Sequence, residues 1–310
     1  MYCFRKHRTR LFALGIWLSV ICFSLMAVSE DVPKLLNASK HLLAHSVGNA
    51  DPALPRRLAT RLNPDQLVAA FYHGSRIERL VALDVAATGS DDPFFLAPSL
   101  ASLMGAADRQ VASMAARALF AIVRAAVSRP DGLDEVIPKR AAQLTEQLRN
   151  VAVDRRLDLD VRQIAIQLIE PLQEKQGIEE RGDWALDMLD DEESAIRRQA
   201  LGVIYLPLSE PAVSKVLKVA TQDTDLLTRG DAAVLLCENA VAHRVSEPSA
   251  DLVDLLQSTI QTPKIPVDVL GGILSCLSEF TGAKRETLLD LVTAHPDPAV
   301  KQYWNQLKTK

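Results

Sequence analysis

The chain has 310 residues, of which 48% are hydrophobic, 24% charged and 5% aromatic. This is the composition of a globular protein and excludes a disordered chain. The formal net charge is −4, and a net negative chain is a poor electrostatic partner for a nucleic-acid backbone.

Residues 1–29 have the pattern of a secretory signal peptide. Basic residues precede an apolar run over Leu11–Val28, and Ala27 and Ser29 supply the small residues of a cleavage site before Glu30. The alternative is an uncleaved membrane anchor, because 18 apolar residues can just span a bilayer. Both interpretations place the rest of the chain outside the cytoplasm, in the periplasm, the cell envelope or the medium.

Removal of this leader makes the exported chain more acidic. It leaves 31 basic and 39 acidic residues, a net charge of −8, and no polybasic patch that would hold the chain on anionic lipid. We therefore expect no nucleic-acid partner, and membrane contact only through an uncleaved N-terminal segment.

Residues 30–63 are expected to form a capping helix and a loop ahead of the main domain. His41 and His45 are four positions apart, which is the spacing of metal ligands on a helix. Neither an intervening Glu nor a third ligand accompanies them, so they are interpreted as surface histidines and no metal site is predicted.

Residues 64–310 follow a pattern of helix, turn and helix. The clearest stretch is DLDVRQIAIQLIEPL, residues 158–172, where apolar side chains recur on one helix face. Ile164 belongs to that face and is expected to lie between layers. No alternating strand pattern occurs, so the sequence predicts an all-α fold.

The second helix of each pair is expected to open with an aliphatic residue. These residues recur at intervals mostly in the thirties, which is typical of stacked helical hairpins, and one longer interval is assigned to a long first helix over residues 133–153. About seven hairpins are expected. Their opening residues are Ile77, Val111, Val161, Ile196, Leu227, Val267 and Val300.

Four of these second helices resemble HEAT-like repeats of the short bacterial kind. The stretches that carry the likeness are DLDVRQIAIQLIEPL, SAIRRQALGVIYL, DTDLLTRGDAAVLLCE and HPDPAVKQYWNQL. The resemblance implies a right-handed α-solenoid whose second helices line a concave face. It also implies a basic binding patch on that face at Arg162, Arg197 and Arg229.

Cys237 and Cys276 remain after the leader takes Cys3 and Cys22 away, and they occupy nearly equivalent places in two neighbouring repeats. A disulfide would suit an oxidising compartment. Two buried thiols are favoured instead, because equivalent residues of neighbouring helices usually hold their Cα atoms too far apart for the bond.

Other chemical signals in the chain are weak. The acidic cluster of Asp187 and residues 190–193 lacks the spacing of a calcium loop and is expected to cap helix ends. Trp184 and Trp304 are expected to be packing residues. No nucleophile elbow, paired-cysteine motif or phosphate loop is present, so no catalytic residue, cofactor or small-molecule ligand is predicted.

These features favour an exported, non-enzymatic interaction or scaffold protein with a protein partner. Two alternatives stay open at this stage. One is a HEAT-like enzyme subunit, for example with a lyase-type activity, and a deep pocket with converging polar groups would favour it. The other is an accessory subunit of an envelope complex, anchored by an uncleaved leader.

Overall fold

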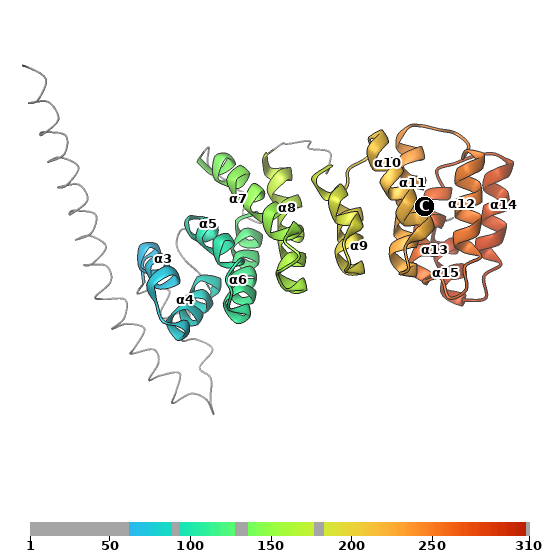
Figure 1. The fold of residues 1–310 in the computed structure, drawn as a ribbon. Coiled ribbons are helices and arrows are strands. Elements are labelled where there is room, and N and C mark those ends of the chain that lie inside the picture. Colours follow the sequence, from blue (N-terminus) through green and yellow to red (C-terminus); the bar gives the residue numbers. More distant parts are fainter. Residues whose placement is uncertain (1–61, 89–92, 128–135, 177–182, 308–310) are drawn as a thin grey trace, which may run out of the picture. The chain divides into compact units, whose positions relative to one another are not determined.

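The computed structural model describes residues 62–88, 93–127, 136–176 and 183–307 (Figure 1). Over these ranges it contains fourteen helices and no strand, which confirms the all-α class. None of the helices there is both long and apolar enough to cross a membrane. The leader, most of the expected capping segment, and His41 and His45 lie outside the described residues.

The helices fall into two compact units. The first holds α3 (Pro64–His73), α4 (Arg76–Thr88), α5 (Pro93–Leu103), α6 (Arg109–Val127), α7 (Val136–Val153) and α8 (Leu159–Gln176). The second holds the 3-10 helix η1 (Asp183–Asp190), α9 (Ser194–Val203), α10 (Glu210–Gln222), α11 (Leu226–Ala242), α12 (Ala250–Ile260), α13 (Val267–Leu277), α14 (Ala283–Thr293) and α15 (Pro298–Leu307).

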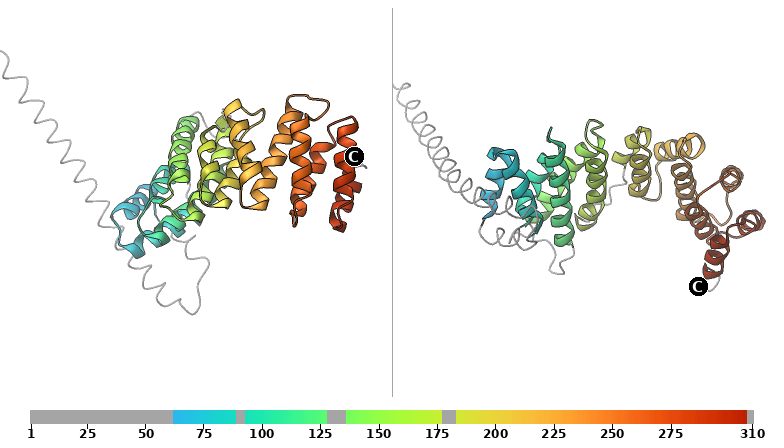
Figure 2. Two further views of the ribbon diagram at one scale, coloured as in Figure 1. Left: turned by 45° about the vertical axis from the view of Figure 1, so that its right-hand side comes forward. Right: turned by 90° about the horizontal axis from the view of Figure 1, so that it is seen from below.

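Each unit contains a layer in which alternate helices pack side by side (Figure 2). We call α4, α6, α8, α9, α11, α13 and α15 the second helices, and the others the first helices. In the first unit α4 contacts α6, which contacts α8. In the second unit the contacts run from α9 to α11, α13 and α15, while α12 contacts α14 among the first helices. Neighbouring layers therefore bury the apolar faces that a single hairpin would expose.

The third residue of every second helix is buried. These residues are Glu78, Val111, Val161, Ile196, Thr228, Val269 and Val300, and none is more than 9% exposed. The expected opening residues were correct in four of the helices. Ile77 was wrong, because it is 53% exposed and Glu78 takes the buried place. Leu227 and Val267 are half-buried and precede the buried residue by one and two positions.

Two of the buried third residues are polar because a capping residue satisfies them. The Ser75 N–H donates to Glu78 Oε2 at 2.6 Å, and the Glu78 N–H reaches Ser75 Oγ at 3.4 Å, which is a capping box. The backbone N–H and the hydroxyl of Thr228 both donate to Asp225 Oδ2, at 2.8 and 2.6 Å. A hydrogen-bonded polar group can be buried at little cost, so an aliphatic residue is not required at this position.

The packing face of α8 differs from the expected one at Ile164, and it also includes Ile166, which is 1% exposed. Val161, Leu168 and Ile169 are at most 1% exposed, as the apolar stripe predicted. Ile164 is only half-buried.

Alanine substitutions in α8 should therefore distinguish the buried Ile169 from the half-buried Ile164. Ile169→Ala is expected to lower the free energy of unfolding by about 2–5 kcal/mol, because it leaves a cavity in the core. Ile164→Ala should cost less than half as much. Urea denaturation followed by circular dichroism measures both, and equal losses would contradict the assigned face.

Cys237 on α11 and Cys276 on α13 form a disulfide, and the expectation of two free thiols was wrong. Their Cα atoms are 6.2 Å apart, which is within the range that the bond requires. The helices approach this closely because glycines face valines across the contact. A Cβ atom on Gly230 would lie 2.5 Å from the Val269 side chain, and one on Gly272 would lie 3.0 Å from Val234.

Gly230 should consequently tolerate no side chain. Gly230→Ala is expected to destabilise the protein by about 1–3 kcal/mol, because the added methyl overpacks against Val269. Gly202→Ala on α9 is the matched control. Nothing lies within 4 Å of its Cβ position, so the higher helix propensity of alanine should stabilise by up to about 1 kcal/mol. Thermal melts compare the two, and a stabilising Gly230→Ala would refute the close contact.

Candidate functional site

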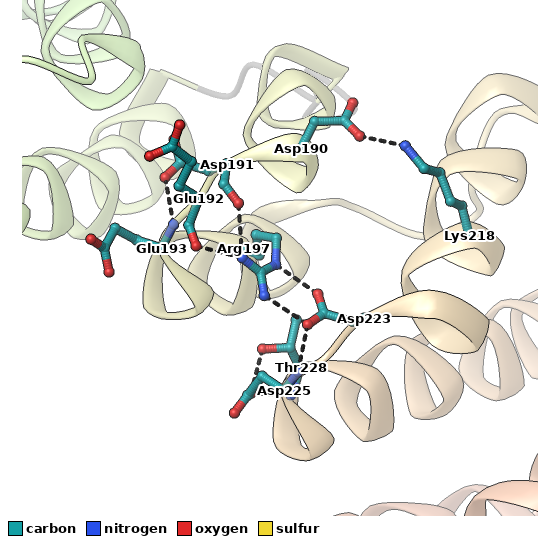
Figure 3. A network of polar contacts seen from close by, with 9 residues as sticks. All are labelled: Asp190, Asp191, Glu192, Glu193, Arg197, Lys218, Asp223, Asp225 and Thr228. Carbon is teal, nitrogen blue, oxygen red and sulfur yellow. Dashed lines mark hydrogen bonds and ion pairs between the residues drawn. The ribbon is translucent and has the colours of Figure 1, made fainter.

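A network of polar contacts in the second unit is centred on Arg197, the fourth residue of α9 (Figure 3). Its Nε and Nη2 donate to the two carboxylate oxygens of Asp223, at 2.6 and 2.7 Å. Its Nη1 donates to the backbone carbonyls of Asp191 and Glu192, at 2.8 and 2.9 Å. The side chains of Arg197 and Asp223 are 11% and 3% exposed, so this bidentate pair is largely shielded from water.

The network continues into the N-terminus of α11. Asp223 Oδ1 accepts the N–H of Asp225, and Asp225 caps α11 through its bonds from Thr228. These bonds from Thr228 hold the pKa of Asp225 below its ordinary value. The hydrogen bond to Asp223 raises the pKa of Arg197 further above its already high value.

These directions set the pH dependence of the network. A lowered carboxyl pKa contributes stability that is present above the unfolded-state value of about 4 and is lost as the pH falls through the lowered pKa. A raised guanidinium pKa contributes stability that is lost only at strongly alkaline pH. The network is therefore intact at neutral pH and is weakened by acid.

The acidic cluster forms ion pairs and one turn contact in the structure. Lys218 Nζ lies 2.8 Å from Asp190 Oδ1, and Lys215 Nζ lies 2.9 Å from Asp187 Oδ1. The hydrogen bond from Lys218 lowers the pKa of Asp190. Asp191 is 5% exposed and accepts the N–H of Glu193. Glu193 is the N-cap of α9 and forms no side-chain capping bond, and Asp191 binds the N–H of that N-cap residue rather than one inside the helix.

A small pocket of about 280 Å³ lies beside this network, with Asp190, Arg197, Lys218 and Asp223 among its lining residues. No group of three His, Cys, Asp or Glu residues that could hold a metal ion occurs within the described ranges. The charges around this pocket are opposite in sign and paired with one another. The arrangement joins the end of η1, the start of α9 and the α10–α11 turn.

The three arginines predicted as a binding patch have different surroundings. Arg162 is 3% exposed and takes part in polar interactions within the chain. Arg197 forms the bonds described above, and Arg229 is half-buried on α11. The burial of Arg162 and the bonds of Arg197 favour a structural role for both residues.

Sequence reasoning missed Arg79, which occupies the same fourth position in α4. Its Nε and Nη2 donate to the backbone carbonyls of Gly74 and Tyr72, at 3.0 and 3.3 Å, at the end of the preceding helix α3. Arg197 binds the carbonyls after η1 in the same way. In α4 and α9 the arginine at the fourth position therefore binds carbonyls at or just after the end of the first helix.

A larger pocket of about 550 Å³ lies between α4 and α6 in the first unit. Partial burial raises the pKa of the Asp84 carboxyl on its α4 side. Arg76 donates from the start of α4 to Gln110 at 2.7 Å, which ties the two helices together at one end. The lining residues include Leu83, Asp84, Arg109, Ser113, Met114 and Arg117.

No family model, curated protein or solved structure matches this chain.

Adjacent arginines on α9 allow a matched test of the network. Arg197→Ala removes one partner of a shielded pair and is expected to cost about 3–5 kcal/mol of stability. Arg198 forms an ion pair with Asp231 at 2.9 Å that is more exposed to water than the Arg197 pair. Arg198→Ala should therefore lower the free energy of unfolding by no more than about 1 kcal/mol. Urea denaturation at pH 7 measures the difference, and similar losses would show that the Arg197 contacts contribute little.

Proposed function

We propose that this chain is an exported, non-enzymatic interaction protein that presents the exposed side chains of its second helices to a protein partner. The observation that carries the proposal is the packing of second helix on second helix within each unit, from α4 to α8 and from α9 to α15. Such packing leaves a row of side chains from successive helices exposed along one surface. Repeat proteins of the HEAT-like kind bind partners through surfaces built in this way.

The disulfide and the leader both support export. Disulfides form and persist mainly outside the cytoplasm, and Cys237–Cys276 joins two helices of the second unit. The leader accounts for the remaining two cysteines, Cys3 and Cys22. An exported chain would therefore retain only the bonded pair.

The exposed side chains of the second helices provide charges that a partner could recognise. Helix α6 contains three arginines and no acidic residue. In the second unit, Glu238 of α11 and Asp268 of α13 are exposed, and α13 contains no basic residue. Helix α6 is thus basic and α13 acidic, and charge complementarity at such helices would select and orient a partner.

Site-specific crosslinking in cells tests this proposal. A photoreactive amino acid at exposed second-helix positions, Gln110 or Asp268, is expected to give one discrete adduct with the same protein. The matched controls are exposed first-helix positions, Asp65 on α3 and Asp251 on α12. Adducts at the control positions alone, or at none of the four, would contradict the proposed surface.

The same preparations report on export. Intact mass is expected to show a chain that begins near Glu30 and whose two cysteines react with maleimide only after reduction. A variant that lacks residues 1–29 should stay in the cytoplasm with reactive thiols. A full-length wild-type chain in the envelope would support the anchored accessory subunit, and one in the cytoplasm would refute export.

A further inference from the structure

The pocket between α4 and α6 combines features of a peptide-binding groove. Leu83 and Ala118 are buried and Met114 half-buried, so these residues give the pocket an apolar base. Arg109 and Arg117 also line the pocket, and both residues are exposed. Most recognition sites combine an apolar base with a few charged groups of this kind.

The two arginines differ in the contacts that their side chains make with the rest of the described chain. Arg109 approaches Asp158 at 3.4 Å, but its side chain stays 87% exposed, so this pair restrains it weakly. Arg117 is exposed and forms no ion pair or hydrogen bond with any described residue. Both guanidinium groups are therefore open to an external carboxylate, which they can bind in bidentate fashion.

The spacing of the arginines matches an extended peptide. Arg109, Ser113 and Arg117 are four residues apart in turn, so they share one face of α6. At a rise of 1.5 Å per residue, Arg109 and Arg117 are about 12 Å apart along the helix axis. Four residues of an extended strand span about 13 Å, and side chains two apart point the same way. Carboxylates at peptide positions i and i+4 would thus reach both arginines.

The residue between those carboxylates would point into the pocket. Position i+2 of such a peptide lies on the same side as i and i+4, opposite Ser113 and next to Met114. The apolar base beneath it favours an aliphatic side chain. Asp84 faces the pocket from α4, and it would repel a third carboxylate on that side.

We propose that the α4–α6 pocket binds an extended acidic segment of a protein, in which two glutamates four residues apart flank an aliphatic residue. This inference rests on the proposed interaction function and specifies its partner chemistry. A nucleic acid is disfavoured because its phosphates would meet a chain with a net charge of −8 outside the leader.

A fluorescein-labelled peptide, Ser-Glu-Ser-Leu-Ser-Glu-Ser, tests the proposal with the chain purified from the envelope. Fluorescence anisotropy is expected to show saturable binding. Replacement of both glutamates by glutamine, or of the leucine by serine, should weaken binding by about tenfold or more, because each removes one set of predicted contacts. Absence of saturable binding, or equal binding of the glutamine peptide, would overturn the proposal.

Two arginine variants of α6 locate the site. Arg117→Ala is expected to weaken the binding of the peptide by about tenfold. Arg124→Ala is the matched control, since Arg124 lies seven residues further along α6, near the Phe120 ring and outside the pocket. Its charge is largely screened at physiological salt, so the change should stay within about twofold. Equal losses in the two variants would refute a specific pocket.

The crosslinking experiment separates this inference from the broader proposal. Adducts at Gln110 and Asp268 together with no peptide binding would overturn the pocket and leave the interaction function in place. Saturable, Arg117-dependent peptide binding without any adduct in cells would support the pocket and refute the broader proposal. Preference for a single-stranded oligonucleotide over the peptide would overturn the acidic-peptide assignment.

Discussion

The first turn of each second helix is the constraint on which the described structure depends. Its third residue is buried in all seven second helices that the structure describes, whatever that residue's chemistry. Where the residue is aliphatic, burial alone stabilises the turn. Where it is Glu78 or Thr228, the capping residue supplies hydrogen bonds that offset the desolvation of the buried polar group. In α4 and α9 an arginine at the next position, Arg79 or Arg197, binds carbonyls at or just after the end of the preceding helix.

This constraint explains which parts of the fold were predictable. The stretch from Asp158 to Leu172 was read correctly at most positions because its apolar stripe has one consistent phase. The start of α4 was misread by one residue, because an exposed Ile77 stands beside a buried Glu78. Hydrophobicity alone cannot recognise a buried carboxylate, but the Ser-x-x-Glu spacing of the capping box could have identified it.

The same one-residue precision limits the prediction of sites. Whether an arginine faces a partner or the carbonyls of its own chain depends on about a third of a helical turn. The sequence therefore identified Arg162 and Arg197 as notable but could not show that both are engaged within the chain. The α4–α6 pocket escaped notice because its lining comes from residues on two helices, none of which forms a motif by itself. The disulfide was misjudged because helix separation depends on Gly230 and Gly272 facing valines.

The covalent bond between α11 and α13 also bears on how the second unit comes apart. In a stack where each layer contacts only its neighbours, opening starts at an end and proceeds layer by layer. A link between residues 39 positions apart crosses one such boundary and encloses α12 within its loop. The helix pairs on either side must then open together, so fraying from the C-terminus would stop at α13 until the bond is reduced.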